Sequence, residues 1–214
     1  MDAARIAELL APFLDTELAP EQLNQISIYI DLLLRWNARI NLTAVRDPEQ
    51  IVTRHFGESL FAARHLLPRD QSALSAGRVV DIGSGAGYPG LPLKIWSPPI
   101  AVTLIESNHK KATFLREVIR ALTLTSIDVF PYRAETYPTV SAGLVTLRAV
   151  EKFESTLPVA AGLLAPQGRL ALWIGEAQTT IAHQALPTLI WARPIPLPGS
   201  QSRVLLLGNN GSMK

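Results

Sequence analysis

A glycine-rich turn between residues 78 and 96 carries the residues of this chain best suited to chemistry. The segment reads RVVDIGSGAGYPGLPLKIW, in which Asp81 precedes Gly83, Gly85 and Gly87. Glycines at the end of a strand let the backbone turn tightly and bring its amide groups close to a ligand. This turn therefore predicts a nucleotide-cofactor site.

The glycine spacing excludes two common phosphate-binding motifs. Dinucleotide-binding turns follow the pattern G-x-G-x-x-G, and the third glycine position is occupied here by Tyr88. A Walker A loop is also excluded, because no Gly-Lys-Ser/Thr follows. The Asp81 carboxylate would repel a pyrophosphate but suits the ammonium and sulfonium groups of S-adenosylmethionine (SAM). We therefore predict SAM as the cofactor, with the alternative that nearby backbone amides satisfy Asp81.

A second acidic residue follows the next apolar segment. Glu106 ends the segment 101–106 and lies 23 residues after Gly83. An acidic residue at this distance, at the end of a strand, is placed to accept hydrogen bonds from both hydroxyls of a ribose. Alternatively, Glu106 caps the helix that begins near Asn108.

Three more candidate residues follow later strands. Ala134 and Glu135 come after a third strand, where an adenine edge would lie, although Glu135 could equally be a solvated loop residue. Arg148 directly follows a fourth strand. Ligands of α/β proteins bind outside the carboxyl ends of the strands, so we expect Arg148 to contact substrate or cofactor, or else to form a surface ion pair.

The elements that must position these residues alternate between strand and helix from Arg78 onward. We expect strands at 78–82, 101–106, 126–130, 143–147, 169–174 and 203–208. Helices are expected at 89–96, 108–124, 151–164 and 176–185, with a turn at Pro166–Gly168. Such alternation predicts an α/β fold with a mostly parallel sheet and helices on both faces. Helical spacing before residue 68 predicts an N-terminal helical extension (1–68), packed on one compact unit (69–214), with a linker at 68–77.

The composition limits the chemistry further. The chain has 214 residues, 48% of them hydrophobic, and no cysteine. The lack of cysteine removes disulfides, thiolate metal sites and thiol nucleophiles together. The net charge is only +2, with 20 basic and 18 acidic residues, so any nucleic-acid binding must depend on local clusters. We expect a cytoplasmic monomer with no bound metal and no membrane segment.

Five segments together resemble one known family. They are WNARINLT (36–43), VTRHFGESL (52–60), VDIGSGAGYPGLPL (80–93), TLIES (103–107) and TLRAV (146–150). This pattern, running from about residue 20 to 207, resembles the bacterial 16S rRNA guanine-N7 methyltransferase G, also called glucose-inhibited division protein B. The resemblance implies a Rossmann-like class I SAM-dependent methyltransferase acting on the small ribosomal subunit near its decoding centre. It also implies cofactor contacts at Gly83, Tyr88, Ala134, Glu135 and Arg148.

Methylation of guanine N7 agrees with the residues that the chain has and lacks. N7 bears no proton, so the reaction needs alignment and no general base. Arg148 could donate to guanine O6 or to a phosphate. Two departures from the family, Ile174 before Gly175 and Ser202 before Arg203, could weaken RNA contacts.

The rRNA contacts themselves are less clearly marked. Arg54 and His55 are expected at the mouth of the site, and Trp36 in the core. One predicted helix carries a cluster of basic residues that could contact RNA or form a solvated face: His109, Lys110, Lys111, Arg116 and Arg120. Two rival functions stay open, a small-molecule methyltransferase and a SAM-binding protein without catalysis.

Overall fold

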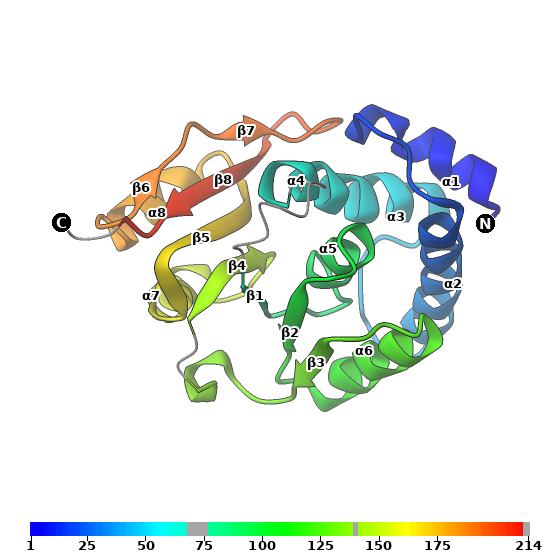
Figure 1. Cartoon of the computed structure of the whole chain (residues 1–214), viewed down its shortest axis with the longest axis horizontal. Coiled ribbons are helices and arrows are strands. Elements are labelled where there is room, and N and C mark those ends of the chain that lie inside the picture. The colour runs from blue at the N-terminus through cyan, green and yellow to red at the C-terminus, as the bar shows by residue number, and fades with distance from the viewer. Residues whose placement is uncertain (68–76, 139–140, 212–214) are drawn as a thin grey trace.

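A single eight-stranded sheet organises the chain, seen in a computed structural model that describes residues 1–67, 77–138 and 141–211. The spatial order of the strands is β3-β2-β1-β4-β5-β8-β6, and β7 also pairs with β8 (Figure 1). The strands are β1 (Arg78–Ile82), β2 (Ala101–Ile105), β3 (Ile127–Phe130), β4 (Ala142–Arg148), β5 (Leu164–Gly175), β6 (Ile190–Trp191), β7 (Ile195–Pro196) and β8 (Arg203–Asn209). Nearly all of the expected linker at 68–77 lies outside the described residues.

The pairing of the strands confirms the expected mostly parallel α/β sheet. Strands β1 to β5 pair in parallel, whereas β8 runs antiparallel to β5, β6 and β7. Strand β1 lies between β2 and β4, so the strand order reverses there. Such a switch point opens a crevice at the carboxyl ends of the two central strands.

Helices cover both faces of this sheet. They are α1 (Ala3–Leu10), α2 (Pro20–Asn37), α3 (Pro48–Ile51), α4 (Glu58–Leu66), α5 (Gly90–Trp96), α6 (His109–Ala121), α7 (Phe153–Gly162) and α8 (Gln178–Ala185). A π-helical segment (Val52–Gly57) joins α3 to α4. Within the described residues, no helix is long and apolar enough to cross a membrane.

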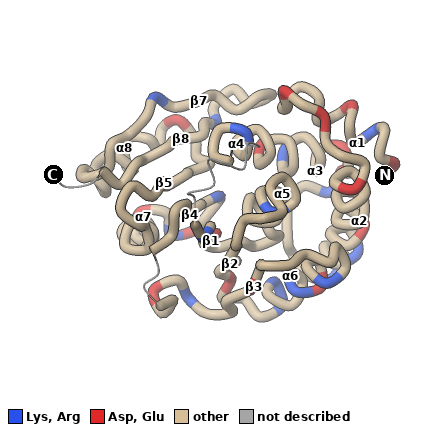
Figure 2. The backbone as a smooth tube through the Cα atoms, viewed as in Figure 1, with Lys and Arg blue, Asp and Glu red and all other residues tan. Residues whose placement is uncertain are grey.

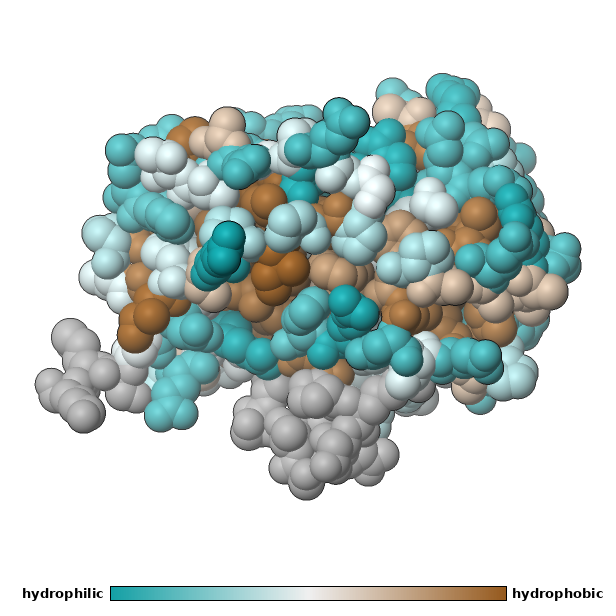
Figure 3. Space-filling model, turned by 90° about the horizontal axis from the view of Figure 1, so that it is seen from above, coloured by the Kyte–Doolittle hydropathy of each residue, from teal (hydrophilic) through white to brown (hydrophobic). Residues whose placement is uncertain are grey.

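The two faces of the sheet belong to two hydrophobic clusters. Because side chains alternate along a strand, Ala171 and Trp173 of β5 pack with the N-terminal helices, α5 and α6. Their neighbours Leu170 and Leu172 pack with α7 and α8 on the other face. The N-terminal helices therefore share one core with the sheet. On the face seen from above, apolar side chains lie between hydrophilic ones (Figure 3).

The helix that begins at Pro48 starts with a side-chain cap and a proline. The Asp47 carboxylate accepts a hydrogen bond from the Gln50 amide at 2.8 Å, and Pro48 occupies the first turn, where no amide hydrogen is needed. The continuing π-helical and α4 segments bury Phe56 and Leu60 completely. These consecutive helical segments place side chains such as Glu58 near the carboxyl end of β4, where the site lies.

The turn expected at Pro166–Gly168 is a bulge inside strand β5, which begins at Leu164; Gln167 has a φ of +64°, and the register with β4 shifts there. Backbone pairing explains the difference. The Gln167 amide donates to the Asn210 carbonyl at 2.8 Å, and the Asn210 amide donates to the Gly168 carbonyl at 2.8 Å. These contacts come from the other end of the chain, so local turn preferences could not reveal them.

Candidate cofactor and substrate site

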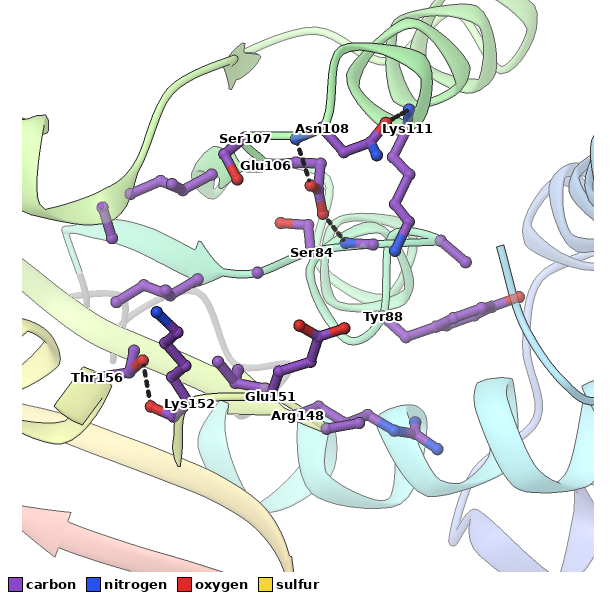
Figure 4. A pocket seen from close by; sticks show the side chains of 18 of the residues that line it. Ser84, Tyr88, Glu106, Ser107, Asn108, Lys111, Arg148, Glu151, Lys152 and Thr156 are labelled. Carbon is purple, nitrogen blue, oxygen red and sulfur yellow. Dashed lines mark hydrogen bonds between the residues drawn. The ribbon is translucent and has the colours of Figure 1, made fainter. Parts of the chain in front are cut away.

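A cavity of about 620 Å³ opens at the carboxyl ends of β1, β2 and β4 (Figure 4). Segments at the ends of β1, β2, β3 and β4 form one wall, which we call the sheet wall: 82–86, 105–108, 132–135 and 148–152. The other wall, the helical wall, comes from Leu42–Ala44 and His55 of the N-terminal region. The cavity therefore lies at the switch point of the sheet, where the sequence predicts the cofactor.

The glycine turn lines this cavity, and its backbone conformation requires glycine. Gly83 and Gly87 have φ angles of +67° and +95°, which side chains with a Cβ rarely adopt. The amides of Gly83 and Ser84 donate to the Ile105 carbonyl at 2.9 and 3.0 Å. These two amides are therefore used to join the turn to β2, which differs from the expectation that they face a ligand.

Glu106 lines the cavity and braces the turn. Its Oε2 accepts from the Gly85 amide at 2.9 Å and its Oε1 from the Asn108 amide at 2.8 Å. A carboxylate has about four acceptor positions, so both oxygens can accept further hydrogen bonds, such as those of a ribose diol. Asn108 itself caps α6, accepting from the amides of Lys110 and Lys111. The geometry thus gives Glu106 the free acceptors that ribose binding requires, and assigns the cap to Asn108.

Asp81 is fully buried and does not line the cavity. Its carboxylate accepts from the Thr146 hydroxyl at 2.7 Å and from the Gly90 amide at 3.3 Å. Burial raises the pKa of Asp81 to about 6, against the hydrogen bonds that favour its charged form. The structure therefore favours the alternative expectation, an internally satisfied carboxylate that ties β1 to β4 and α5.

Tyr88 joins the turn to the N-terminal helices. Its ring stacks on His55 with centroids 4.7 Å apart, and on Tyr29 at 5.5 Å. Tyr29 also donates a hydrogen bond to the Ala86 carbonyl of the turn. Tyr88 is only 6% exposed and lines the cavity as part of an aromatic stack.

Arg148 lines the cavity, but its guanidinium points toward the N-terminal helices (Figure 4). It donates to the Arg54 carbonyl at 2.6 Å and to the Glu58 carboxylate at 3.0 Å. A longer contact of 3.3 Å reaches the Ser59 hydroxyl. In this conformation the donors of Arg148 are engaged inside the protein, in an ion pair that is buried and not on the surface.

Glu58 is the centre of this ion-pair cluster and was not found from the sequence. Its side chain is 2% exposed, and its carboxylate also accepts from Arg203 of β8 at 2.7 Å. Burial raises the pKa of Glu58, while Arg148 and Arg203 oppose the shift. A charged residue at a buried position of an amphipathic helix was the available signal. The cluster fastens α4 to β4 and β8.

His55 lies in the helical wall as a neutral imidazole. Burial, with the charges of Arg148 and Arg54, lowers the pKa of His55 to about 3. Since Arg148 can only donate, its 3.4 Å contact with Nδ1 makes that nitrogen the acceptor and places the proton on Nε2. Nε2 then donates to the Thr43 hydroxyl at 2.8 Å. His55 thus lies at the site as expected from the sequence.

Other lining residues complete the cavity. Ala134 and Glu135 belong to a short 3-10 helix (Ala134–Thr136) and line the cavity on the β3 side. Lys111 of α6 and Glu151, just after β4, point into it from opposite sides (Figure 4). The position of Glu151 after a strand end was the signal that could have identified it. Within the described ranges, no group of three His, Cys, Asp or Glu could hold a metal ion.

The sheet order, the glycine turn and the cavity at the switch point define a class I SAM-dependent methyltransferase fold. The ribosomal protein L11 methylase of Lactobacillus delbrueckii subsp. bulgaricus shares this fold, with a TM-score of 0.60 and 13% identity, over 73% of this chain and 78% of that one. P. horikoshii TYW2, in complex with MeSAdo, superposes with a TM-score of 0.58 and 16% identity, over 72% and 62% of the two chains.

The sequence comparisons identify the family. The model of the GidB family, rRNA small subunit methyltransferase G, matches residues 22–189. The ribosomal RNA small subunit methyltransferase G of Halorhodospira halophila is 38% identical over 197 residues, which cover 91% of this chain and 90% of that protein. This chain belongs to the rRNA small subunit methyltransferase G family and is an rRNA methyltransferase, as its sequence motifs indicate.

Proposed function

We propose that this protein transfers the methyl group of SAM to N7 of one guanine in the 16S rRNA of the small ribosomal subunit or its precursor. The observation that carries the proposal is the cavity with two different walls. The sheet wall offers Glu106 with free acceptor positions, and the helical wall places Thr43 and His55 opposite. A cavity of about 620 Å³ lies within the usual range for ligand sites, with two sides for two ligands.

The residues present fit SAM as the cofactor. Glu106 would accept from the ribose, Gly83 would allow close approach, and Ala134 and Glu135 would border the adenine. When bound, SAM supplies the electrophilic methyl carbon for the transfer. Asp81, which we expected at the ammonium, is too deeply buried for this role, and Glu151 is the carboxylate that points into the cavity instead.

The helical wall would orient the acceptor base without removing a proton. Guanine N7 is a free lone pair, so the residues around it need only hold the ring and exclude water. A neutral His55 adds no positive charge where a cationic product forms. The Glu151 carboxylate would offset that charge across the cavity.

For Arg148 we propose a positioning role in addition to the substrate contact expected from the sequence. Its guanidinium binds the carbonyl of Arg54 and the carboxylate of Glu58, and so fixes the helical wall to β4. An Arg148→Ala variant should then lose methylation by about 100-fold, because a small displacement of the acceptor is costly. Arg148→Lys should recover little, since lysine cannot form the same fork of hydrogen bonds. Full methylation by Arg148→Ala at normal SAM affinity would contradict both roles.

The reaction can be tested with labelled SAM and small subunits, or their rRNA, that lack the modification. The rRNA is then cleaved chemically at N7-methylguanine. We expect one labelled guanine, cleaved at that position. Label in no guanine would overturn the proposal, and label at another atom would change the acceptor. Transfer to metabolites in the absence of RNA would support the rival small-molecule methyltransferase.

A further inference from the structure

A second cavity lies beside the methyl-transfer site, between α2 and α6. It has a volume of about 310 Å³ and is lined by Arg35, Trp36, Arg39, Ile40, Lys110 and Glu117. We call it the α2–α6 groove. None of these residues lines the methyl-transfer cavity, so the groove lies outside the site assigned above to the cofactor and the acceptor base.

The α2–α6 groove carries three exposed cations. Arg35, Arg39 and Lys110 form no ion pair with any carboxylate of the described residues. The one acidic residue of the lining, Glu117, accepts a hydrogen bond from the Trp36 indole at 3.1 Å. The groove therefore combines a net positive charge with an aromatic ring held in place.

Trp36 is fixed by the core as well as by Glu117. Its ring meets Phe114 edge-on, with centroids 5.8 Å apart, and it is only partly buried. Trp36 was expected in the core. It packs there only in part, because it also lines the groove. Grooves that follow a nucleic-acid strand combine positive charges along the backbone with aromatic side chains.

The groove and the methyl-transfer cavity are lined by neighbouring residues of the same two segments. On α6, Lys110 lines the groove and the next residue, Lys111, lines the cavity. On the other side, Ile40 lines the groove, and Leu42 lines the cavity two residues later. Figure 2 shows Lys and Arg (blue) on α6 and on the adjoining part of α2. A polymer whose one residue occupies the cavity would thus extend naturally into the groove.

We infer that the α2–α6 groove binds the sugar-phosphate backbone of the rRNA nucleotides next to the target guanine. The inference rests on the proposed function, because it needs the target base in the neighbouring cavity. Arg35, Arg39 and Lys110 pair with phosphates, contacts that set the register of the RNA without reading its sequence. The small net charge of the protein makes such a local cluster necessary for binding a polyanion.

The test compares Arg39→Gln with a matched control, Arg193→Gln, another exposed arginine without an ion pair in the described structure. A triple variant, Arg35→Gln/Arg39→Gln/Lys110→Gln, should weaken RNA binding further than Arg39→Gln alone. Binding to 16S rRNA is measured over a range of salt concentrations. Loss of three phosphate contacts should make the negative slope of the logarithm of the binding constant against log salt less steep by about 2. It should also weaken RNA binding about tenfold. KM for RNA should rise while kcat and SAM affinity stay unchanged, because such contacts bind substrate and transition state alike.

Each outcome has one meaning. If the wild type methylates rRNA and the triple variant binds it like the wild type, the groove inference fails and the proposed function stands. If the wild type neither binds nor methylates rRNA, the proposed function itself fails. If Arg193→Gln weakened RNA binding as much as Arg39→Gln, the effect would come from the overall charge of the protein, and the groove inference would be contradicted. A loss seen with assembled small subunits but not with protein-free rRNA would assign the groove to a protein partner, and would also overturn the inference.

Discussion

The two walls of the methyl-transfer cavity are held by different interactions. In the sheet wall, backbone amides bind Glu106 and the Ile105 carbonyl, and the residues involved lie within about one strand–turn–helix unit. The helical wall is held by an aromatic stack and by buried charges that join residues about 90 positions apart, such as Glu58 and Arg148 of the sheet wall. The sheet wall is therefore a local backbone structure, whereas the helical wall depends on long-range side-chain contacts.

This difference suggests a division of tasks. A site built from backbone geometry can recur wherever the fold recurs, and the L11 methylase shares this fold. A wall built from side chains of an added helical region can be specific to one acceptor. The following predictions test this contrast through the stability that each wall contributes and its dependence on pH.

The largest effect concerns His55 in the helical wall. Its pKa is lowered from 6.5 to about 3, so its contribution is complete above pH 6.5 and is lost as the pH falls toward 3. That difference corresponds to about 4–5 kcal/mol of the free energy of unfolding. His55→Gln should remove this acid sensitivity, measured by urea unfolding between pH 7 and pH 3. Identical pH profiles in the variant and the wild type would contradict a buried neutral imidazole.

Removal of Glu58 should destabilise the protein almost as strongly. Glu58→Ala leaves Arg148 without its carboxylate partner in a buried position, which costs about 3–5 kcal/mol. Urea unfolding at pH 7 measures the change. The matched control is Glu135→Ala, an exposed glutamate, which should change the free energy by less than about 0.5 kcal/mol. A similar small change in both variants would show that the cluster does not hold the helical wall.

Asp81, beneath the sheet wall, should respond to pH in the opposite direction. Its pKa is raised from 3.8 to about 6, so its contribution is complete below pH 3.8 and is lost as the pH rises through about 6. The loss corresponds to about 3 kcal/mol. Asp81→Asn should remove this contribution, so the difference in unfolding free energy between the variant and the wild type should shift by that amount between pH 4 and pH 7 in urea unfolding experiments. A difference between the two proteins that stays constant over this range would show that Asp81 is not the group responsible.

Much of the sheet wall could be predicted from the sequence. Short apolar runs located β1, β2 and β4, and the 23-residue separation between Gly83 and Glu106 identified the ribose candidate. These features are local, or repeat with the period of a strand and a helix, so a linear sequence contains them. The family resemblance added the methyltransferase class, which the comparisons confirm.

The directions of the side chains could not be predicted in the same way. Asp81 turns away from the cavity because Thr146, 65 residues later in the chain, donates to it across neighbouring strands. Arg148 turns toward Glu58 for a similar reason. In both cases the partner is known only after the sheet and the helical region have been assembled.

The most direct test of the division between the walls is the SAM dissociation constant of two variants, measured by titration calorimetry. Glu106→Gln, in the sheet wall, should weaken SAM binding about tenfold or more, because it loses hydrogen bonds to a charged acceptor. Thr43→Val, in the helical wall, should change SAM affinity less than about twofold, since it alters the contacts of the hydroxyl with His55 and with the Val45 amide. Equal weakening of SAM binding by both variants, or wild-type affinity in Glu106→Gln, would contradict the account.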